Sequence, residues 1–406
     1  MPLWERETHF FRSVGGLRKA LTLSTFSSAL VAALLGVTGP ALLVYQAAVN
    51  SRFTDAQTGS WFFAIYVGGG VFSIWLAMAY RQPICGAFSI AGAALLIQTL
   101  PGFGAAPAVG AYLMSGALIA VLGFTGAFER VMRLFPPGIV LAMLTGVLMR
   151  FGISIFTELA ADPLLIAPVI LVFCLAMRFN LRLPPVTLAL AVGVALAMVL
   201  HPWPEQPIPL ALTIPVPIAP EFTWNAFLSL SLPLMLLALS SQNATGIGVL
   251  WAMGYRAPVN AVTIATGVFS MLTAPFGGHG INLATPMTAI CGDPASHPDP
   301  DLRWGAAAIN GVLFIVFGLL GLTLVALIQV LPLGLIKAVA GLALAPVLLQ
   351  SLEKSFGAGQ YRFGCLFALV IAASNVTWLG VGAAFWALVL ATVISFLVDP
   401  DWRKDP

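Results

Sequence analysis

The sequence predicts an all-α polytopic membrane protein with fourteen transmembrane segments, arranged as two inverted repeats of seven. Sixty per cent of its 406 residues are hydrophobic and only 8% are charged, and the mean hydropathy is +0.99. A soluble domain carries about 25% charged residues, so lipid must solvate much of this chain. Apolar runs of spanning length recur along the chain, and segments of the first half recur in the second. The basic residues are scattered and the net charge is only +3, so no nucleic-acid partner is expected.

Apolar runs long enough to cross a bilayer, about 20 residues each, occur seven times in each half of the chain. In the first half they cover residues 20–48, 60–80, 84–100, 108–127, 136–156, 163–178 and 184–201. In the second half they cover residues 225–254, 258–274, 275–291, 304–330, 332–351, 361–376 and 378–398.

A proline-rich segment separates the two sets of spans. Residues 202–224 contain seven prolines, which are incompatible with a continuous helix. We therefore expect residues 1–201 to form one repeat, residues 202–224 an extended linker, and residues 225–398 the second repeat.

The distribution of basic residues predicts the orientation. With the N-terminus in the cytoplasm and fourteen alternating spans, all of the 18 Lys and Arg residues except Arg52, Arg150 and Lys337 fall in cytoplasmic segments. Cytoplasmic loops carry such an excess of Lys and Arg. The sequence thus predicts a multi-pass protein of the inner (cell) membrane with both termini in the cytoplasm.

Two sequence matches indicate an internal repeat. Gly70–Ser73, which reads Gly-Val-Phe-Ser, recurs as Gly267–Ser270. Seven identities follow at a constant offset of 195, from Gly116 matching Gly311 to Gly146 matching Gly341. Because seven is an odd number, the second copy must cross the membrane in the opposite sense, as in many secondary transporters.

The third and tenth spans are predicted to be discontinuous, each with a short extended piece followed by a half-helix. The third begins with Pro83 and Gly86, and the tenth with Pro275 and Gly278. Proline disfavours helix in the residue before it, and glycine permits unusual dihedrals. The N-termini of the half-helices, expected at Ala87–Ser89 and His279–Gly280, would carry free N–H groups and a partial positive charge, which suit a carboxylate.

Polar residues near the middle of other spans complete the candidate site. The first span has a Gly-Val-Thr-Gly-Pro interruption, and the eighth has the run Ser240–Gly246. Interhelical hydrogen bonding is the alternative explanation, and we prefer it for Ser240 and Thr245. The predicted substrate-binding residues are Thr38, Gly39, Ala87, Phe88, Ser89, Ser241, Gln242, Asn243, His279, Gly280 and Asn282. His279 is also the candidate for proton coupling, because it is the only histidine inside a predicted span.

The segment Gly277–Thr285, the fourteen-span layout and the Ser-Gln-Asn run of the eighth span resemble the benzoate/proton symporter family, BenE. The resemblance covers nearly the whole chain. It implies an architecture similar to nucleobase and sulfate transporters, in which a core domain (about 20–127 and 225–330) moves against a gate domain (about 136–201 and 332–398). It also implies a possible homodimer.

One departure bears on the cargo. Nucleobase transporters of similar fold carry glutamates in the eighth and tenth spans, whereas this sequence has Gln242 or Asn243 and Ile281 or Asn282. A pocket without carboxylates suits a substrate that brings its own negative charge.

We therefore expect a secondary transporter that imports a small aromatic carboxylate, such as benzoate, with a proton, by alternating access. Another cargo on the same fold, a nucleobase or inorganic anion, is an alternative, and a passive anion channel is another. No carboxylate pair, metal-ligand cluster or nucleophile–base pattern indicates an enzyme, a metal site or a cofactor. The four cysteines lie in apolar stretches without Cys-x-x-Cys spacing.

Overall fold

The computed structural model describes residues 10–126, 136–179, 183–201, 210–379 and 381–403. Several residues predicted to be cytoplasmic lie outside these ranges: Arg6, Arg130, Arg133, Arg182 and Lys404. The first part of the predicted linker, residues 202–209, also lies outside them.

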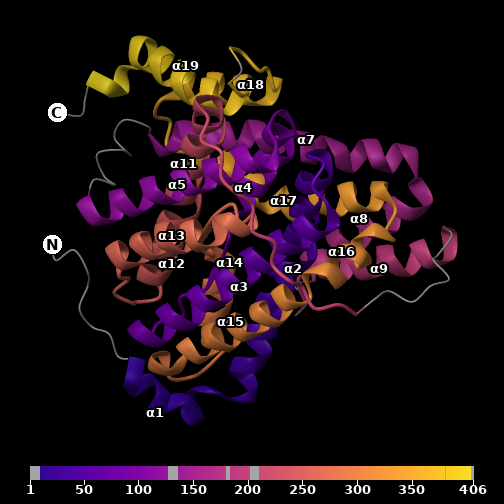
Figure 1. Cartoon of the computed structure of the whole chain (residues 1–406), viewed down its shortest axis with the longest axis vertical. Helices are drawn as coiled ribbons and strands as arrows, with labels where there is room; N and C mark the ends of the chain where they lie inside the picture. The colour runs from indigo at the N-terminus through magenta and orange to yellow at the C-terminus, as the bar shows by residue number, and fades with distance from the viewer. Residues whose placement is uncertain (1–9, 127–135, 180–182, 202–209, 380, 404–406) are drawn as a thin grey trace.

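Among the described residues of the first half, the regular elements are helices and one short strand (Figure 1). Its elements are α1 (Phe10–Ala20), α2 (Leu23–Asn50), α3 (Asp55–Tyr80), β1 (Gly86–Phe88), α4 (Ile90–Thr99), α5 (Ala105–Thr125), α7 (Pro137–Ala161), α8 (Pro163–Arg178) and α9 (Pro185–Leu200). The first predicted span begins three residues later than expected. Thr22 caps α2 through a reciprocal pair of hydrogen bonds with Thr25, which separates α2 from α1.

In the described residues of the second half, helices again accompany one short strand. Its elements are α10 (Trp224–Ala226), the π-helical segment η2 (Phe227–Ser231), α11 (Leu232–Leu237), the π-helical segment η3 (Ala238–Asn243), α12 (Ala244–Ala252), α13 (Val259–Thr273), β2 (Ile281–Leu283), α14 (Thr285–Gly292), α15 (Trp304–Leu319), α16 (Gly321–Gln329), α17 (Leu333–Phe356), α18 (Arg362–Ser374) and α19 (Ala383–Val398). The predicted eleventh span is thus two helices. They separate at Leu320, where Gly321 packs against the backbone of Gly59 in α3.

Among the described residues, eight helices are long and apolar enough to cross a membrane, and five shorter apolar helices accompany them. Residues 210–223 contain no helix or strand. Along them Thr213 N–H donates to the Leu319 carbonyl (2.8 Å) and Ile218 N–H donates to the Pro275 carbonyl (2.7 Å). This segment therefore follows the surface of the helices as an extended strap.

Two crossed helix pairs hold the middle of the protein together, and each depends on glycines from both halves. In Figure 1, α3 and α15 lie side by side, and their closest approach joins Gly70 to Gly311. The pair α5 and α13 meets in the same way at Gly116 and Gly267. A Cβ atom on any of these four glycines would collide with backbone of the facing helix. The repeat-related glycines, Gly70 with Gly267 and Gly116 with Gly311, thus occupy equivalent positions in two equivalent crossings.

A second group of helices is built around α7 and α17, which pack against each other and against α18 and α8. Glu158 of α7 and Lys337 of α17 form an ion pair with an N–O distance of 3.1 Å. Gly39 of α2 touches this group directly, because a Cβ there would collide with the side chain of Ala343 in α17.

Candidate functional site

The two predicted helix breaks are confirmed, and they meet in a two-stranded antiparallel sheet. Helix α3 ends at Tyr80 and α13 at Thr273, and the chain is extended at β1 and β2. In the register of the sheet, Ala87 faces Asn282 and Phe88 faces Ile281. Hydrogen bonds extend the pairing at both ends, from Ser89 N–H to the Gly280 carbonyl (3.3 Å) and from Ala284 N–H to the Cys85 carbonyl (2.8 Å).

One serine fixes the start of each strand. Ser73 Oγ accepts from Gly86 N–H (2.7 Å) and donates to the Gly69 carbonyl of its own helix (2.9 Å). Ser270 Oγ accepts from Ile281 N–H (2.9 Å) and donates to the Thr266 carbonyl of its own helix (2.6 Å). Ser73 and Ser270 are the final residues of the repeated Gly-Val-Phe-Ser sequences. The repeat is therefore the sequence signal that could have identified them.

Helix α4 begins inside the protein with unpaired donors. Ser89 is its N-cap and accepts a hydrogen bond from Gly92 N–H at Oγ (2.9 Å). Within the described chain, the backbone N–H groups of Ile90 and Ala91 have no acceptor, and Ala91 is fully buried. Such groups at a helix N-terminus, together with the helix dipole, form a ready binding place for an anion.

The second half-helix begins later than expected. The prediction placed the helix N-terminus at His279–Gly280, but α14 starts at Thr285, after β2. The reason is that Ile281–Leu283 pairs with β1 before the chain can turn into a helix. His279 and Gly280 consequently lie beside the start of α4, whereas the start of α14 contacts the eighth span, where Thr285 Oγ1 donates to the Gln242 carbonyl (3.3 Å).

His279 is buried, and both of its ring nitrogens have partners. Trp61 Nε1–H donates to Nδ1 (3.0 Å), and Nε2 lies 2.9 Å from the Ser89 carbonyl. The backbone that carries it turns sharply at Gly277 and Gly280, with φ angles of 90° and 141° that glycine tolerates. Sequence reasoning missed Trp61, because only the tertiary fold brings α3 to this loop.

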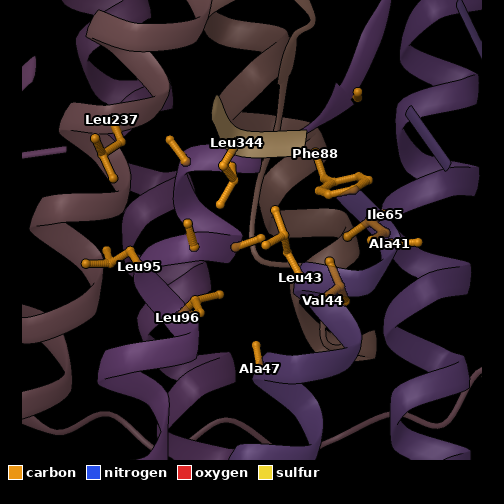
Figure 2. Close-up of a cluster of buried hydrophobic side chains, with 14 of the residues drawn as sticks. Ala41, Leu43, Val44, Ala47, Ile65, Phe88, Leu95, Leu96, Leu237 and Leu344 are labelled. Atoms are coloured by element: carbon orange, nitrogen blue, oxygen red, sulfur yellow. The ribbon is translucent and has the colours of Figure 1, made fainter. Parts of the chain in front are cut away.

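Aromatic rings surround His279. The ring centroids of Trp61, Phe88 and Tyr112 lie 5.6, 5.7 and 6.4 Å from that of the imidazole, all in edge-to-face orientation. The Phe88 ring also meets Tyr66 edge-on at 5.5 Å. Figure 2 shows Phe88 in one buried cluster with Ile65 of α3 and with Leu43 and Val44 of α2.

Helix α2 runs through Pro40 without a break. Pro40 has no N–H to offer the Gly36 carbonyl, and the Tyr66 hydroxyl donates to that carbonyl instead (3.2 Å). Thr38 Oγ1 donates to the Leu34 carbonyl (2.8 Å) and lies 3.2 Å from Thr187 Oγ1 of α9. Thr38 also lines an apolar cavity of about 420 Å³ between α2, α9 and α16. Thr38 therefore faces α9, and Gly39 faces α17 and α9.

The polar run of the eighth span forms η3, and π-helical turns often occur at functional sites. Asn243 is committed to the scaffold, because its amide donates to Thr266 Oγ1 (3.0 Å) and accepts from Leu283 N–H of β2 (3.0 Å). Ser241 and Gln242 instead line a small cavity of about 20 Å³ against α7 and α17, to which Ser351 and Lys354 contribute. Within the described chain, the Gln242 side-chain amide forms no hydrogen bond there.

Asn282 is the middle residue of β2 and lies opposite Ala87 of β1. It is fully buried, and neither its amide oxygen nor its amide nitrogen has a partner in the described part of the chain. A buried polar group without a partner costs about 1–3 kcal/mol, so an unpaired amide at this position is a candidate ligand-binding group. The same description fits Asn310 of α15.

The structure therefore brings most of the predicted residues into two adjoining places. The first place is the β1–β2 pair together with the start of α4, and it contains Ala87, Phe88, Ser89, His279, Gly280 and Asn282. Ser241 and Gln242 lie at the cavity against α7 and α17, and Asn243, next in the chain, bonds to β2. The described residues contain no group of three His, Cys, Asp or Glu side chains that could hold a metal ion.

Comparison with known proteins places the whole chain in one context. Residues 19–397 match the family model BenE, described as benzoate membrane transport protein. The chain is 34% identical to the inner membrane protein YdcO of Escherichia coli over 91% of its own length and 94% of that protein. It is 29% identical to the benzoate membrane transport protein of Acinetobacter baylyi over 94% and 97% of the two chains.

Solved structures resemble it in fold. The overall structure of SLC26A9 matches with a TM-score of 0.63 at 14% identity over 91% of this chain, which spans 65% of that longer protein. The transmembrane domain of a cyanobacterium bicarbonate transporter, BicA, matches with a TM-score of 0.56 at 15% identity over 96% and 99% of the two chains.

Proposed function

This chain belongs to the BenE family of benzoate membrane transport proteins, and from that premise we propose that it imports a small aromatic carboxylate together with a proton by alternating access. Members of the family are multi-pass membrane transporters and not enzymes. The substrate, the coupling to protons and the direction are the new parts of the proposal.

The start of α4 is the observation that supports an aromatic carboxylate as the substrate. Unpaired N–H groups of Ile90 and Ala91 point from a buried helix N-terminus beside the Phe88 ring. No Asp or Glu occurs in the sequence between Asp55 and Glu129 or between Glu221 and Asp293, the stretches that contain β1 and β2. A carboxylate would find donors here and no like charge, and its aromatic ring would find an apolar wall.

In this proposal the substrate carboxylate binds at Ile90 and Ala91, next to Ser89 and Ala87. The Asn282 amide and the Gln242 amide orient it, and Phe88 contacts its ring. Thr38, Gly39 and Ser241 line the boundary at which the core slides on the gate. The crossed glycine pairs and the matching Ser73 and Ser270 contacts support two inverted seven-span repeats, with residues 202–224 between them.

Charge balance is the reason for proposing that a proton accompanies the substrate. Moving a bare anion against an inside-negative potential costs about 2.3 kcal/mol per 100 mV, and one accompanying proton cancels that charge. Two groups are candidates to carry it, the substrate carboxyl itself and His279. We further propose inner-membrane insertion with cytoplasmic termini, and a homodimer.

The proposal is tested with the purified protein in liposomes. We expect labelled benzoate to accumulate when the outside is made more acidic, and to stop accumulating when an ionophore removes the gradient. Unlabelled benzoate should compete with the label, whereas uracil and bicarbonate should not. Saturation of the rate with substrate distinguishes a carrier from a channel, and uptake indifferent to the gradient would reject proton coupling.

A further inference from the structure

The hydrogen bonds of His279 fix its protonation state in this conformation. The Trp61 indole can only donate, so Nδ1 must be an acceptor and carry no proton. The Ser89 carbonyl can only accept, so Nε2 must carry the hydrogen and donate it. His279 is therefore a neutral imidazole in the Nε2–H form.

A second proton has no place on this ring. Protonated Nδ1 would confront the Trp61 N–H at 3.0 Å, with two donors and no acceptor between them. The ring is surrounded by Trp61 of α3, Phe88 of β1, Ser89 at the N-cap of α4 and Tyr112 of α5. Tyr112 is the single titratable group among these neighbours, and none of them carries a negative charge that would stabilise an imidazolium.

The same bonds clamp the first residue of α4. The Ser89 carbonyl accepts from His279 Nε2 and also from Ala93 N–H (2.8 Å), the first hydrogen bond of the helix. Ser89 N–H donates to the Gly280 carbonyl, next to His279. The imidazole thus connects Trp61 of α3 to the residue that sets where the unpaired N–H groups of Ile90 and Ala91 point.

We propose that His279 is a positioning residue that stays neutral throughout transport, and that the transported proton travels on the substrate carboxyl group. This inference rests on the proposed function for its second half. The balance is simple: a carboxylate and one proton form the neutral acid, which crosses and then releases the proton on the other side. No protein group needs to change its protonation state.

Conservative substitutions separate positioning from proton carriage. His279→Gln retains a donor that can reach the Ser89 carbonyl, and His279→Asn retains an acceptor that can reach Trp61, but neither side chain takes up a proton. In liposomes with an internal pH dye, we expect both variants to keep the same ratio of protons to benzoate as the parent, with KM raised about 3- to 10-fold. His201→Gln, at the far end of α9, is the matched control and should leave rate and ratio unchanged. Benzoate uptake without proton movement in either His279 variant would overturn the proposal.

A spectroscopic measurement tests the neutral state independently of transport. In protein labelled with ¹⁵N-histidine, the signals of His279 are identified by their loss in His279→Gln. We expect them to show the Nε2–H neutral form unchanged between about pH 5 and pH 8, the range in which free histidine titrates. Titration within that range would overturn the positioning half. If the parent protein shows no gradient-driven uptake, the proposed function and the proton half fail together, and this spectrum still decides the positioning half.

Discussion

Ala87 and Asn282 face each other at the centre of the antiparallel β1–β2 pair. They are separated in sequence by 195 residues, the offset that also relates Gly116 to Gly311. In the proposed inverted repeat these are equivalent residues of the two copies, and they would meet on its two-fold axis. Ser89 and Ala284, the N-cap residues of α4 and α14, are related by the same offset. At the axis of this proposed arrangement the first half of the chain contributes the methyl group of Ala87 and the second half the amide of Asn282.

The unpaired amide of Asn282 should favour ligand binding at the expense of stability. Replacing it with alanine removes two buried polar groups that have no partner, so we expect Asn282→Ala to keep or raise the melting temperature. Benzoate affinity should fall about tenfold, or about 1.4 kcal/mol. Thermal unfolding with and without benzoate measures both effects. Asn243→Ala is the matched control, because its amide is fully bonded and its loss should lower the melting temperature.

Ser73 and Ser270 should be equivalent in energy as well as in geometry. Changing either to alanine leaves a strand N–H without its acceptor, Gly86 in one case and Ile281 in the other. We expect each change to destabilise the protein by about 1–3 kcal/mol, and by similar amounts. Denaturation in detergent measures this. A large loss at one serine and none at the other would contradict the two-fold arrangement.

The crossed glycines should tolerate no side chain. Gly70→Ala or Gly267→Ala would drive a methyl group into backbone of the facing helix, and we expect loss of folded protein or a destabilisation of more than about 3 kcal/mol. Gly248→Ala in α12 is the control. A Cβ there meets no other atom within 4 Å, so the same substitution should be neutral or stabilise by about 0.4–1 kcal/mol. Yield of monodisperse protein and melting temperature distinguish the two classes.

Tyr66 and Pro40 should be energetically coupled. Tyr66→Phe leaves the buried Gly36 carbonyl without a donor, at a cost of about 1–3 kcal/mol. In a Pro40→Ala background, the new backbone N–H of residue 40 can donate to that carbonyl, so Tyr66→Phe should cost far less. A double-mutant cycle on the free energy of unfolding measures the difference. Equal costs in both backgrounds would show that the hydroxyl is not replacing the missing donor.

Much of this architecture could be predicted from local sequence, and the rest required tertiary contacts. Pro83 and Pro275 marked the two breaks, because proline constrains its own neighbourhood whatever surrounds it. The start of α14 was predicted at the wrong residue, because pairing of Ile281–Leu283 with β1 is a contact between distant segments. The roles of Trp61 and Tyr66 likewise depend on how α3 lies against the loop before β2 and against α2, and no pattern within α3 reports this.

A carboxylate introduced beside the second half-helix should test the electrostatic basis of the site. Gln242 lines the cavity between η3 and the α7–α17 group, together with Thr245 and Lys354. At neutral pH, Gln242→Glu would place a negative charge near the site where the substrate carboxylate is proposed to bind before it takes up the proton, and we expect benzoate uptake to fall at least tenfold. The uncharged Gln242→Met, of similar length, should reduce it much less.

The pH dependence of that defect follows from its sign. A glutamate carboxyl loses its charge as the pH falls, so the repulsion should weaken and the ratio of Gln242→Glu to parent uptake should rise from pH 7.5 towards about pH 5. Comparing ratios at each pH removes the effect of acid on the driving force, which both proteins share. A ratio independent of pH would mean that the defect is steric, and that the absence of carboxylates between Glu221 and Asp293 does not select the cargo.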